Sequence, residues 1–274
     1  MSKKSRKRPG NCAFCGAGNL SKEHIWPQWA FPFVRTHDAS GSNISGFFVQ
    51  EDKTLVSKKV KERQGDVTTT KIRAVCARCN NGWMNEIEGA MQRVAAPLIL
   101  GRPATITLAM QTVIAQWLTL KVMVGEHSQR NPAEVVIPQS ARQAFKDQRI
   151  IPACIRLWIA RCVSNRWRSG YLRHSALLSD NVSIVPNNGR KNVQTTAIGI
   201  GELFSYAMVS VSESIQLHEF FRISDRLVPL WPPQGGDIIW PPSTPINERA
   251  ADTAALALDT LMKSPGVGWR PIPV

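Results

Sequence analysis

The stretch Cys76-Ala-Arg-Cys79-Asn-Asn-Gly-Trp-Met84, together with the earlier pair Cys12-Ala-Phe-Cys15, decides how the first third of this chain folds. In each pair two residues separate the cysteines, a spacing at which both thiolates can bind one ion. Two such pairs complete a tetrahedral Cys₄ site, which is typical of structural zinc. The alternative is that the cysteines are incidental buried residues. The sequence predicts one structural Zn²⁺ bound by four ligands: Cys12, Cys15, Cys76 and Cys79.

A helix is expected directly after the second cysteine pair. Apolar residues recur there every three or four positions, at Met84, Ile87, Met91, Val94 and Ala95. This period predicts a helix that begins at Asn80 or Asn81 and ends near Pro97. The two remaining cysteines, Cys154 and Cys162, stand in an apolar run without a partner at ligand spacing, so we expect them in the core.

The chain divides by composition into an arm, a small module and a larger domain. Residues 1–10 form a basic arm, and 11–97 form the cysteine-containing module, with a polar insertion at about 37–70 that suggests a hairpin or a mobile segment. Residues 98–274 are expected to form an α+β accessory domain, which is a possible site for a protein partner. The fold class is therefore α+β: a zinc-stapled module followed by a larger α+β domain.

Periodicity places the elements of the second part. Helical patterns occur at Thr107–Val124, Gln139–Gln148 and Asn247–Lys263. Strand patterns occur at Ile155–Val163, Tyr171–Leu178, Thr195–Ile200 and Leu203–Val211. Gly201-Glu202 is suited to turn a hairpin between the last two strands, and the proline-rich 229–245 is expected to be irregular.

The segment between the cysteine pairs carries the chemically informative residues. It contains Glu23-His24-Ile-Trp-Pro27, and Asn80 directly follows the last cysteine. Together with the four cysteines, this arrangement resembles the HNH endonuclease family over residues 11–97. The resemblance implies a ββα-metal (HNH/treble-clef-like) module and Mg²⁺- or Mn²⁺-dependent hydrolysis of phosphodiester bonds, with DNA as the expected substrate. A role in phage defence, restriction or mobile elements would fit such a protein.

The resemblance also assigns residue roles. It implies that His24 is the general base and that Glu23 and Asn80 bind the catalytic ion, with Asn81 as the alternative to Asn80. A histidine suits this role because its unperturbed pKa lies near neutrality. Other interpretations remain open: His24 as a structural or surface residue, and Asn80 as a helix N-cap.

Three positions depart from the family's pattern. Glu23 replaces the usual Asp or His, and Trp83 replaces a usual Lys. The middle Asn that braces the loop of the base is missing, so Thr70 or a backbone carbonyl must brace His24. Because adjacent strand residues point to opposite faces, Glu23 and His24 need a turn or a distorted strand end to share a site. These departures keep open a second function, a non-catalytic zinc-containing nucleic-acid-binding protein.

Positive charge is concentrated around the motif. The chain has 34 Lys plus Arg against 20 Asp plus Glu, a net charge of +14 and a pI near 10.0. The first hundred residues carry a net charge of +8. Such an excess can bind phosphates through counterion release, although it can also serve solubility alone. The basic residues lie in the arm (Lys3, Lys4, Arg6, Lys7, Arg8), in the insertion (Lys53, Lys58, Lys59, Lys61, Arg63) and in a later cluster (Arg156, Arg161, Arg166, Arg168, Arg173).

No segment is expected to span a membrane. The longest nearly apolar run, Ala109–Gly125, is interrupted by Gln111, Gln116 and Lys121, whereas a spanning helix needs about 18 or more apolar residues. No apolar region follows the basic arm, which excludes a typical secretory signal. We therefore expect a soluble, cytoplasmic protein, and in that reducing compartment cysteine pairs favour metal binding over disulfides.

Overall fold

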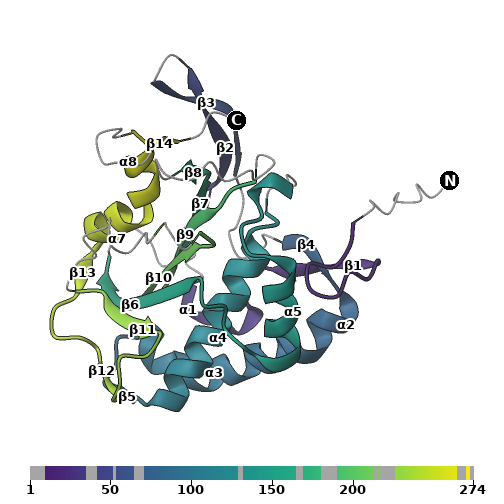
Figure 1. Cartoon of the computed structure of the whole chain (residues 1–274). Coiled ribbons are helices and arrows are strands. Elements are labelled where there is room, and N and C mark those ends of the chain that lie inside the picture. The colour runs from purple at the N-terminus through teal and green to yellow at the C-terminus, as the bar shows by residue number, and fades with distance from the viewer. Residues whose placement is uncertain are drawn as a thin grey trace.

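The computed structural model describes residues 10–34, 42–51, 54–64, 71–128, 132–164, 169–179, 190–212, 215, 226–263 and 270–271. For 34, 42–51, 54–64, 179, 261–263 and 270–271 it describes the backbone alone. The basic arm, up to residue 9, lies outside the described residues, as does Thr70. The chain has an α+β fold, as the sequence predicts (Figure 1).

The first part of the fold is a two-stranded sheet followed by a helix. Strand β1 (Leu20–His24) pairs antiparallel with β4 (Lys71–Cys76). The chain then forms α2 (Ala77–Cys79), a π-helical turn (Asn80–Met84) and α3 (Asn85–Ile99). The predicted helix is therefore present, but it begins earlier and is interrupted at Gly82, whose φ of −95° and ψ of −118° are not helical.

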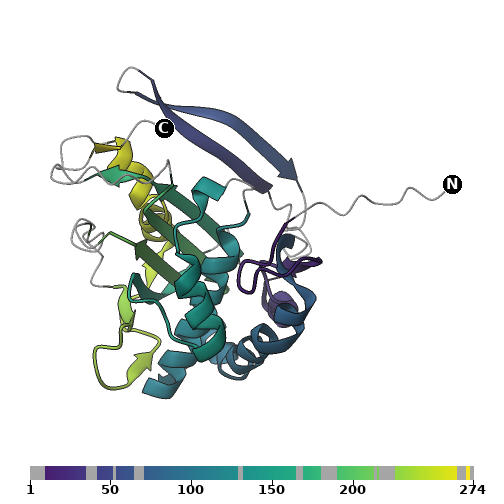
Figure 2. The same ribbon diagram turned by 45° about the vertical axis from the view of Figure 1, so that its right-hand side comes forward.

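The insertion between β1 and β4 contains a hairpin, as one of the two interpretations of the sequence proposed. Strands β2 (Ser42–Glu51) and β3 (Thr54–Gln64) pair antiparallel. A short 3₁₀ turn (Gln28–Ala30) and α1 (Phe31–Val34) precede it. Figure 2 shows the long hairpin along one side of the molecule, on the same side as the C-terminal helix.

Two helices follow at the predicted positions. Helix α4 (Leu108–Gly125) is capped by Thr107, whose hydroxyl accepts a hydrogen bond from the Met110 N–H, and α5 (Gln139–Gln148) matches the predicted bounds. Helix α4 is long and apolar enough to cross a membrane, but 67% of it is buried inside the protein. Core helices of soluble proteins pass the same test, so α4 gives no clear indication of a membrane protein.

The largest sheet has the strand order β11-β6-β10-β9-β7, and β13 pairs with β6. The turn predicted between β9 and β10 is present, with Gly201 at a φ of +56°, where an added Cβ would lie 2.4 Å from the Ile99 carbonyl oxygen. The strands are β6 (Ile155–Val163), β7 (Ser169–Ala176), β9 (Val193–Ile200), β10 (Leu203–Ser210), β11 (Val228–Trp231) and β13 (Ile246–Asn247).

Both faces of this sheet are covered, because alternate residues of each strand point to opposite sides. On one face Leu157 and Ile159 belong to the core shared with α3 and α4. On the other, Trp158 and Ala160 pack in the cluster that contains α7 (Glu248–Ala255). The predicted last helix is broken after α7, and α8 (Ala257–Lys263) follows. Cys162 is buried in the second cluster, as expected, and Cys154 is half-buried.

Short strand pairs complete the structure. The proline-rich segment is not entirely irregular, because β11 lies within the large sheet and β12 (Ile238–Trp240) pairs with β5 (Ala104–Ile106). Strand β8 (Leu178–Ser179) pairs with β14 (Arg270–Pro271), and a 3₁₀ turn spans Pro132–Glu134. The first hydrophobic cluster extends from Cys12 to Trp240, across the expected domain boundary at 97/98, and that boundary stays a prediction.

Candidate functional site

The four predicted metal ligands meet at one place. The sulfur atoms of Cys12, Cys15, Cys76 and Cys79 all lie within 4.8 Å of one another, and Cys15 Sγ lies 3.6 Å from Cys76 Sγ. Four sulfurs about 2.3 Å from a tetrahedral zinc lie about 3.8 Å apart. The quartet therefore fits a structural metal ion such as zinc. Among the residues that the structure describes, this is the group of His, Cys, Asp and Glu side chains suited to hold an ion.

Backbone hydrogen bonds shape the first cysteine knuckle. The Gly16 N–H donates to the Cys12 carbonyl at 2.9 Å, and the Cys12 N–H donates to the Ala17 carbonyl at 2.8 Å. Gly16 has a φ of +71°, a conformation that glycine adopts without strain. Burial raises the pKa of the Cys12 thiol, but nearby backbone N–H groups outweigh that effect and lower it to about 7. The backbone thus favours the thiolate at Cys12, whereas the pKa of Cys15, the other cysteine of this knuckle, is raised.

Glu23 and Asn80 are brought together, as the resemblance implies. Glu23 lies on strand β1 and is 8% exposed. The Asn80 side-chain amide donates a hydrogen bond to the Glu23 carboxylate, and its nitrogen lies 3.4 Å from the Ser21 hydroxyl oxygen. Asn80 has helical backbone angles and is not an N-cap, because α2 has Cys76 at that position. Asn81 is exposed. Asn80, rather than Asn81, thus faces Glu23.

His24 occupies the last position of β1, opposite Lys71 of β4. Its ring is half-buried, and the ring centroid lies 6.1 Å from that of Phe31. The strand register is irregular between Ser21 and Glu23, which is before Glu23 and His24 and not between them. Among the described contacts, none joins the His24 ring to Glu23 or Asn80. Burial lowers the pKa of His24, and the positive charges of Lys71 and Lys121 lower it further.

Lys121 is the residue of this site that sequence reasoning missed. It comes from α4 and is 3% exposed, and its ammonium lies 2.5 Å from Glu88 Oε1 and 3.5 Å from Glu23 Oε1. It also donates to the His24 carbonyl oxygen at 3.4 Å. Burial alone lowers the pKa of Lys121, but the two carboxylates outweigh that effect and raise it. The sequence does show a single lysine within a mainly apolar helical pattern, which indicates a buried charge, but it does not indicate which residues pair with that charge.

Glu88 is held by two tryptophans. The indole N–H groups of Trp29 and Trp117 donate to Glu88 Oε2 at 3.0 and 2.9 Å. Burial raises the pKa of Glu23. The positive charge of Lys121 lowers this pKa, and the negative charge of Glu88 raises it further. Lys121 is thus shared between one carboxylate from β1 and one from α3.

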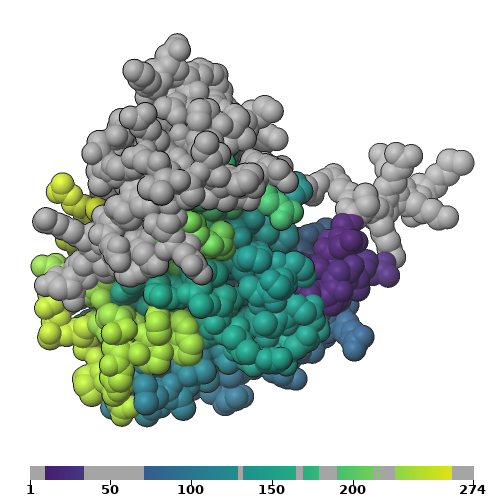
Figure 3. Space-filling view, in the orientation of Figure 1, coloured from purple at the N-terminus to yellow at the C-terminus, as the bar shows by residue number. Residues whose placement is uncertain are grey.

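Trp83, where the family has Lys, serves packing. Its ring meets Phe14 edge-on with centroids 4.8 Å apart, and Phe145 of α5 in the same way at 5.9 Å. The Arg149 guanidinium lies 4.9 Å from the Trp83 ring centroid, which favours a cation–π contact. The Gln139 amide donates to the Phe14 carbonyl at 3.2 Å, and Figure 3 shows the knuckle segment at the surface beside the segment that contains α5.

The later arginine cluster is partly used inside the protein. Arg173 donates to Gln194 Oε1 at 2.9 Å and to the Glu134 carbonyl oxygen, and Arg161 Nε lies 2.5 Å from a Glu202 carboxylate oxygen. Arg166 and Arg168 lie outside the described residues. Arg161 and Arg173 therefore each have a partner within the protein, and phosphate binding by this cluster stays a prediction.

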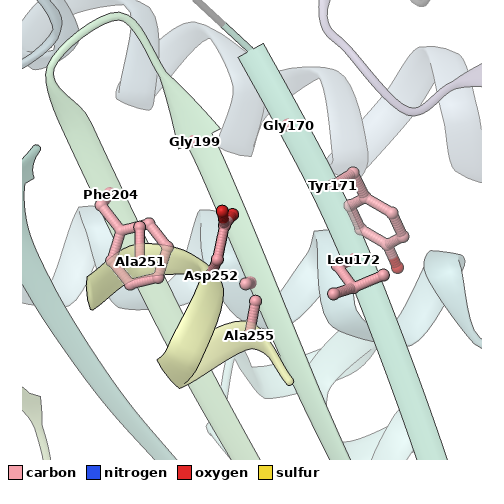
Figure 4. Close-up of a pocket in the computed structure, with 9 residues that line it drawn as sticks. Gly170, Tyr171, Leu172, Gly199, Phe204, Ala251, Asp252 and Ala255 are labelled. Atoms are coloured by element: carbon pink, nitrogen blue, oxygen red, sulfur yellow. The ribbon is translucent and has the colours of Figure 1, made fainter. Parts of the chain in front are cut away.

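A small pocket of about 190 Å³ lies elsewhere, between α7 and strands β7, β9 and β10 (Figure 4). Its lining is mainly apolar, with Phe204 and Ala251, and Asp252 is its charged residue. Figure 1 places α7 on the opposite side of the molecule from β1 and α2. The pocket is therefore separate from the residues that the sequence predicts for the site.

The fold and the quartet define an α+β protein with a four-cysteine site that could hold a structural metal ion. No family model, no curated protein and no solved structure matches the chain.

Proposed function

We propose that this protein is an HNH-type endonuclease that hydrolyses phosphodiester bonds, with DNA as its substrate and zinc in the cysteine quartet. One observation carries the proposal. An antiparallel strand pair and the following helix are joined at the quartet, and Glu23-His24 ends the first strand while Asn80 opens the π-helical turn beside Glu23. This is the arrangement that the family resemblance implies.

His24 would act as the general base. Hydrolysis needs a water molecule to attack phosphorus in line with the leaving oxygen, and a nearby group must accept its proton. The lowered pKa of His24 favours the neutral imidazole at neutral pH, which is the form that accepts a proton. The half-buried position at a strand end leaves part of the ring accessible. The basic arm would bind the DNA backbone without reading its sequence.

The catalytic Mg²⁺ or Mn²⁺ ion belongs to the proposal as well, with Glu23 and Asn80 as its ligands. As these residues lie, however, they do not form an open ion site. The Glu23 carboxylate is buried, and its Oε1 atom lies 3.5 Å from the Lys121 ammonium. An ion at Glu23 would have to compete with that ammonium.

The same ion pair favours a second candidate function, a zinc-containing nucleic-acid-binding protein that does not cleave. A module that does not bind the catalytic ion would still have the cysteine quartet and the basic residues that bind nucleic acid. Such a protein would retard DNA in a gel, with a steep dependence on salt, and would leave the DNA intact with every divalent ion.

A plasmid-cleavage assay with Mg²⁺ or Mn²⁺ tests the first candidate. We expect the parent protein to cleave and His24→Ala to be slower by about 100-fold or more, the usual effect of removing a general base. The control is His127→Ala, which changes a histidine outside the module, two residues after the end of α4. Zinc content and melting temperature of each variant should match the parent. Cleavage by His24→Ala at the parent's rate would show that the catalytic assignment is wrong.

A further inference from the structure

Lys121 is the one charged residue of α4, and the rest of that helix is apolar or uncharged. Its side chain is 3% exposed. A buried ammonium is costly unless anionic or polar partners compensate for the lost water. The surroundings of Lys121 must therefore be arranged around its charge.

Three oxygen atoms surround this ammonium, which has three hydrogens to donate. They are Glu88 Oε1 at 2.5 Å, Glu23 Oε1 at 3.5 Å and the His24 carbonyl oxygen at 3.4 Å. Two carboxylates and a carbonyl are also a ligand set that suits a hard divalent ion. These three oxygens therefore favour a bound cation, and in this structure the cation is the ammonium group of Lys121 from α4.

We propose that the Lys121 ammonium is the resident cation of this oxygen group, which includes Glu23, one of the two residues that the HNH resemblance assigns to a divalent ion. Glu23 is then a counterion of Lys121 and does not bind Mg²⁺ or Mn²⁺ in the folded protein. The inference rests on the same site as the proposed function. It replaces the role of Glu23 as an ion ligand in the first candidate function, and it leaves the role of His24 and the second candidate function unchanged.

Electrostatics supports this arrangement. A divalent ion at Glu23 would lie within a few ångströms of a fixed positive charge in a buried environment, where repulsion is poorly screened. Trp29 and Trp117 hold the second carboxylate, Glu88, toward the ammonium. Displacing Lys121 would leave its charge in the core without a partner, because every residue of α4 from Trp117 to Gly125 is buried.

Mn²⁺ binding to the zinc-loaded full-length protein, measured by electron paramagnetic resonance, tests the inference. We expect the parent and Glu23→Gln to bind Mn²⁺ equally weakly. Lys121→Met frees the three oxygens, so it should bind one Mn²⁺ at least about tenfold more tightly than the parent, a difference of about 1.4 kcal/mol. Adding Glu23→Gln to Lys121→Met should abolish the gain. Adding Glu86→Gln should not, because Glu86 lies exposed on the same helix as Glu88.

Two results would overturn the inference: Mn²⁺ binding by the parent that Glu23→Gln weakens, or no gain of binding in Lys121→Met. If Lys121→Met does not fold, Lys121→Gln replaces it, since its amide can donate to the carboxylates without a charge, and the same criteria apply. The cleavage assay is independent, because an inactive parent would reject the nuclease proposal and leave the Mn²⁺ result unchanged.

Discussion

At the scale of single residues, buried charges in this protein are compensated by partners from distant segments. Glu126 and Arg142 illustrate this, with 0% and 1% of their surfaces exposed. The Glu126 carboxylate accepts hydrogen bonds from Arg142 and from the N–H groups of Val136 and Ile137 at 3.1 Å. Arg142 also donates to the Met123 carbonyl at 3.1 Å. This pair connects the C-terminal end of α4 to Val136, Ile137 and α5.

We expect Glu126→Ala to be strongly destabilised. Removing one partner of a buried ion pair leaves the other charge uncompensated, which costs about 3–5 kcal/mol in free energy of unfolding. Urea denaturation followed by circular dichroism measures the loss. Asp147→Asn is the control, because its partner Lys146 lies at the surface and the pair is solvated. Equal stability of the two variants would contradict the role given to Glu126.

At the scale of elements, the cysteine quartet joins three pieces of structure. Cys12 and Cys15 precede β1, Cys76 ends β4, and Cys79 ends α2. The Ala13 N–H also donates to the Ala74 carbonyl at 2.8 Å, which ties the first knuckle to β4. A strand pair this small is marginal by itself, so we expect the metal to stabilise it.

Zinc should be present at one equivalent per chain by elemental analysis. Cys79→Ser removes a ligand, so we expect it to lose most of the zinc and to melt at a lower temperature than the parent. Cys162→Ser is the matched control, because it changes a buried cysteine of the large sheet that lies outside the quartet. Less than about half an equivalent of zinc in the parent would reject the Cys₄ assignment.

At the scale of the whole molecule, the knuckle module shares its core with the rest of the chain. Helix α3 packs on α4, which also contacts the large sheet. Glu88 of α3 accepts a hydrogen bond from Trp117 of α4, and Lys121 of α4 binds Glu23 of β1. The two parts expected from the sequence are thus joined by apolar and ionic contacts.

A chain truncated after residue 97 should therefore not fold alone, even with zinc. It would expose the α3 surface that packs on α4, and it would leave Glu23 and Glu88 without Lys121. We expect poorly dispersed amide signals in its ¹H–¹⁵N NMR spectrum, in contrast to the full chain. A well-dispersed spectrum would instead support an autonomous module at 11–97.

Elements with a strong local pattern could be predicted. Strand β6, helix α5 and the hairpin of β9 and β10 lie where alternation, helical period and Gly201 placed them. The break in the last helix and the short strands in the proline-rich segment were missed, because tertiary pairing decides them. Within the site, the spacing of the cysteines predicted the quartet, and the proximity of Asn80 to Glu23 followed from the resemblance.

The sequence by itself determined the α+β class, the cysteine quartet that could hold a metal ion and the elements whose side chains repeat with a clear period, because these depend on spacing along the chain. Only the tertiary structure decided the environment of Glu23, since Lys121 lies 98 residues away in sequence and reaches it through the packing of α4. A buried charge takes whichever partner the fold brings within a few ångströms. The ion pair between Lys121 and Glu23 is therefore a property of the folded chain that no local sequence pattern predicts.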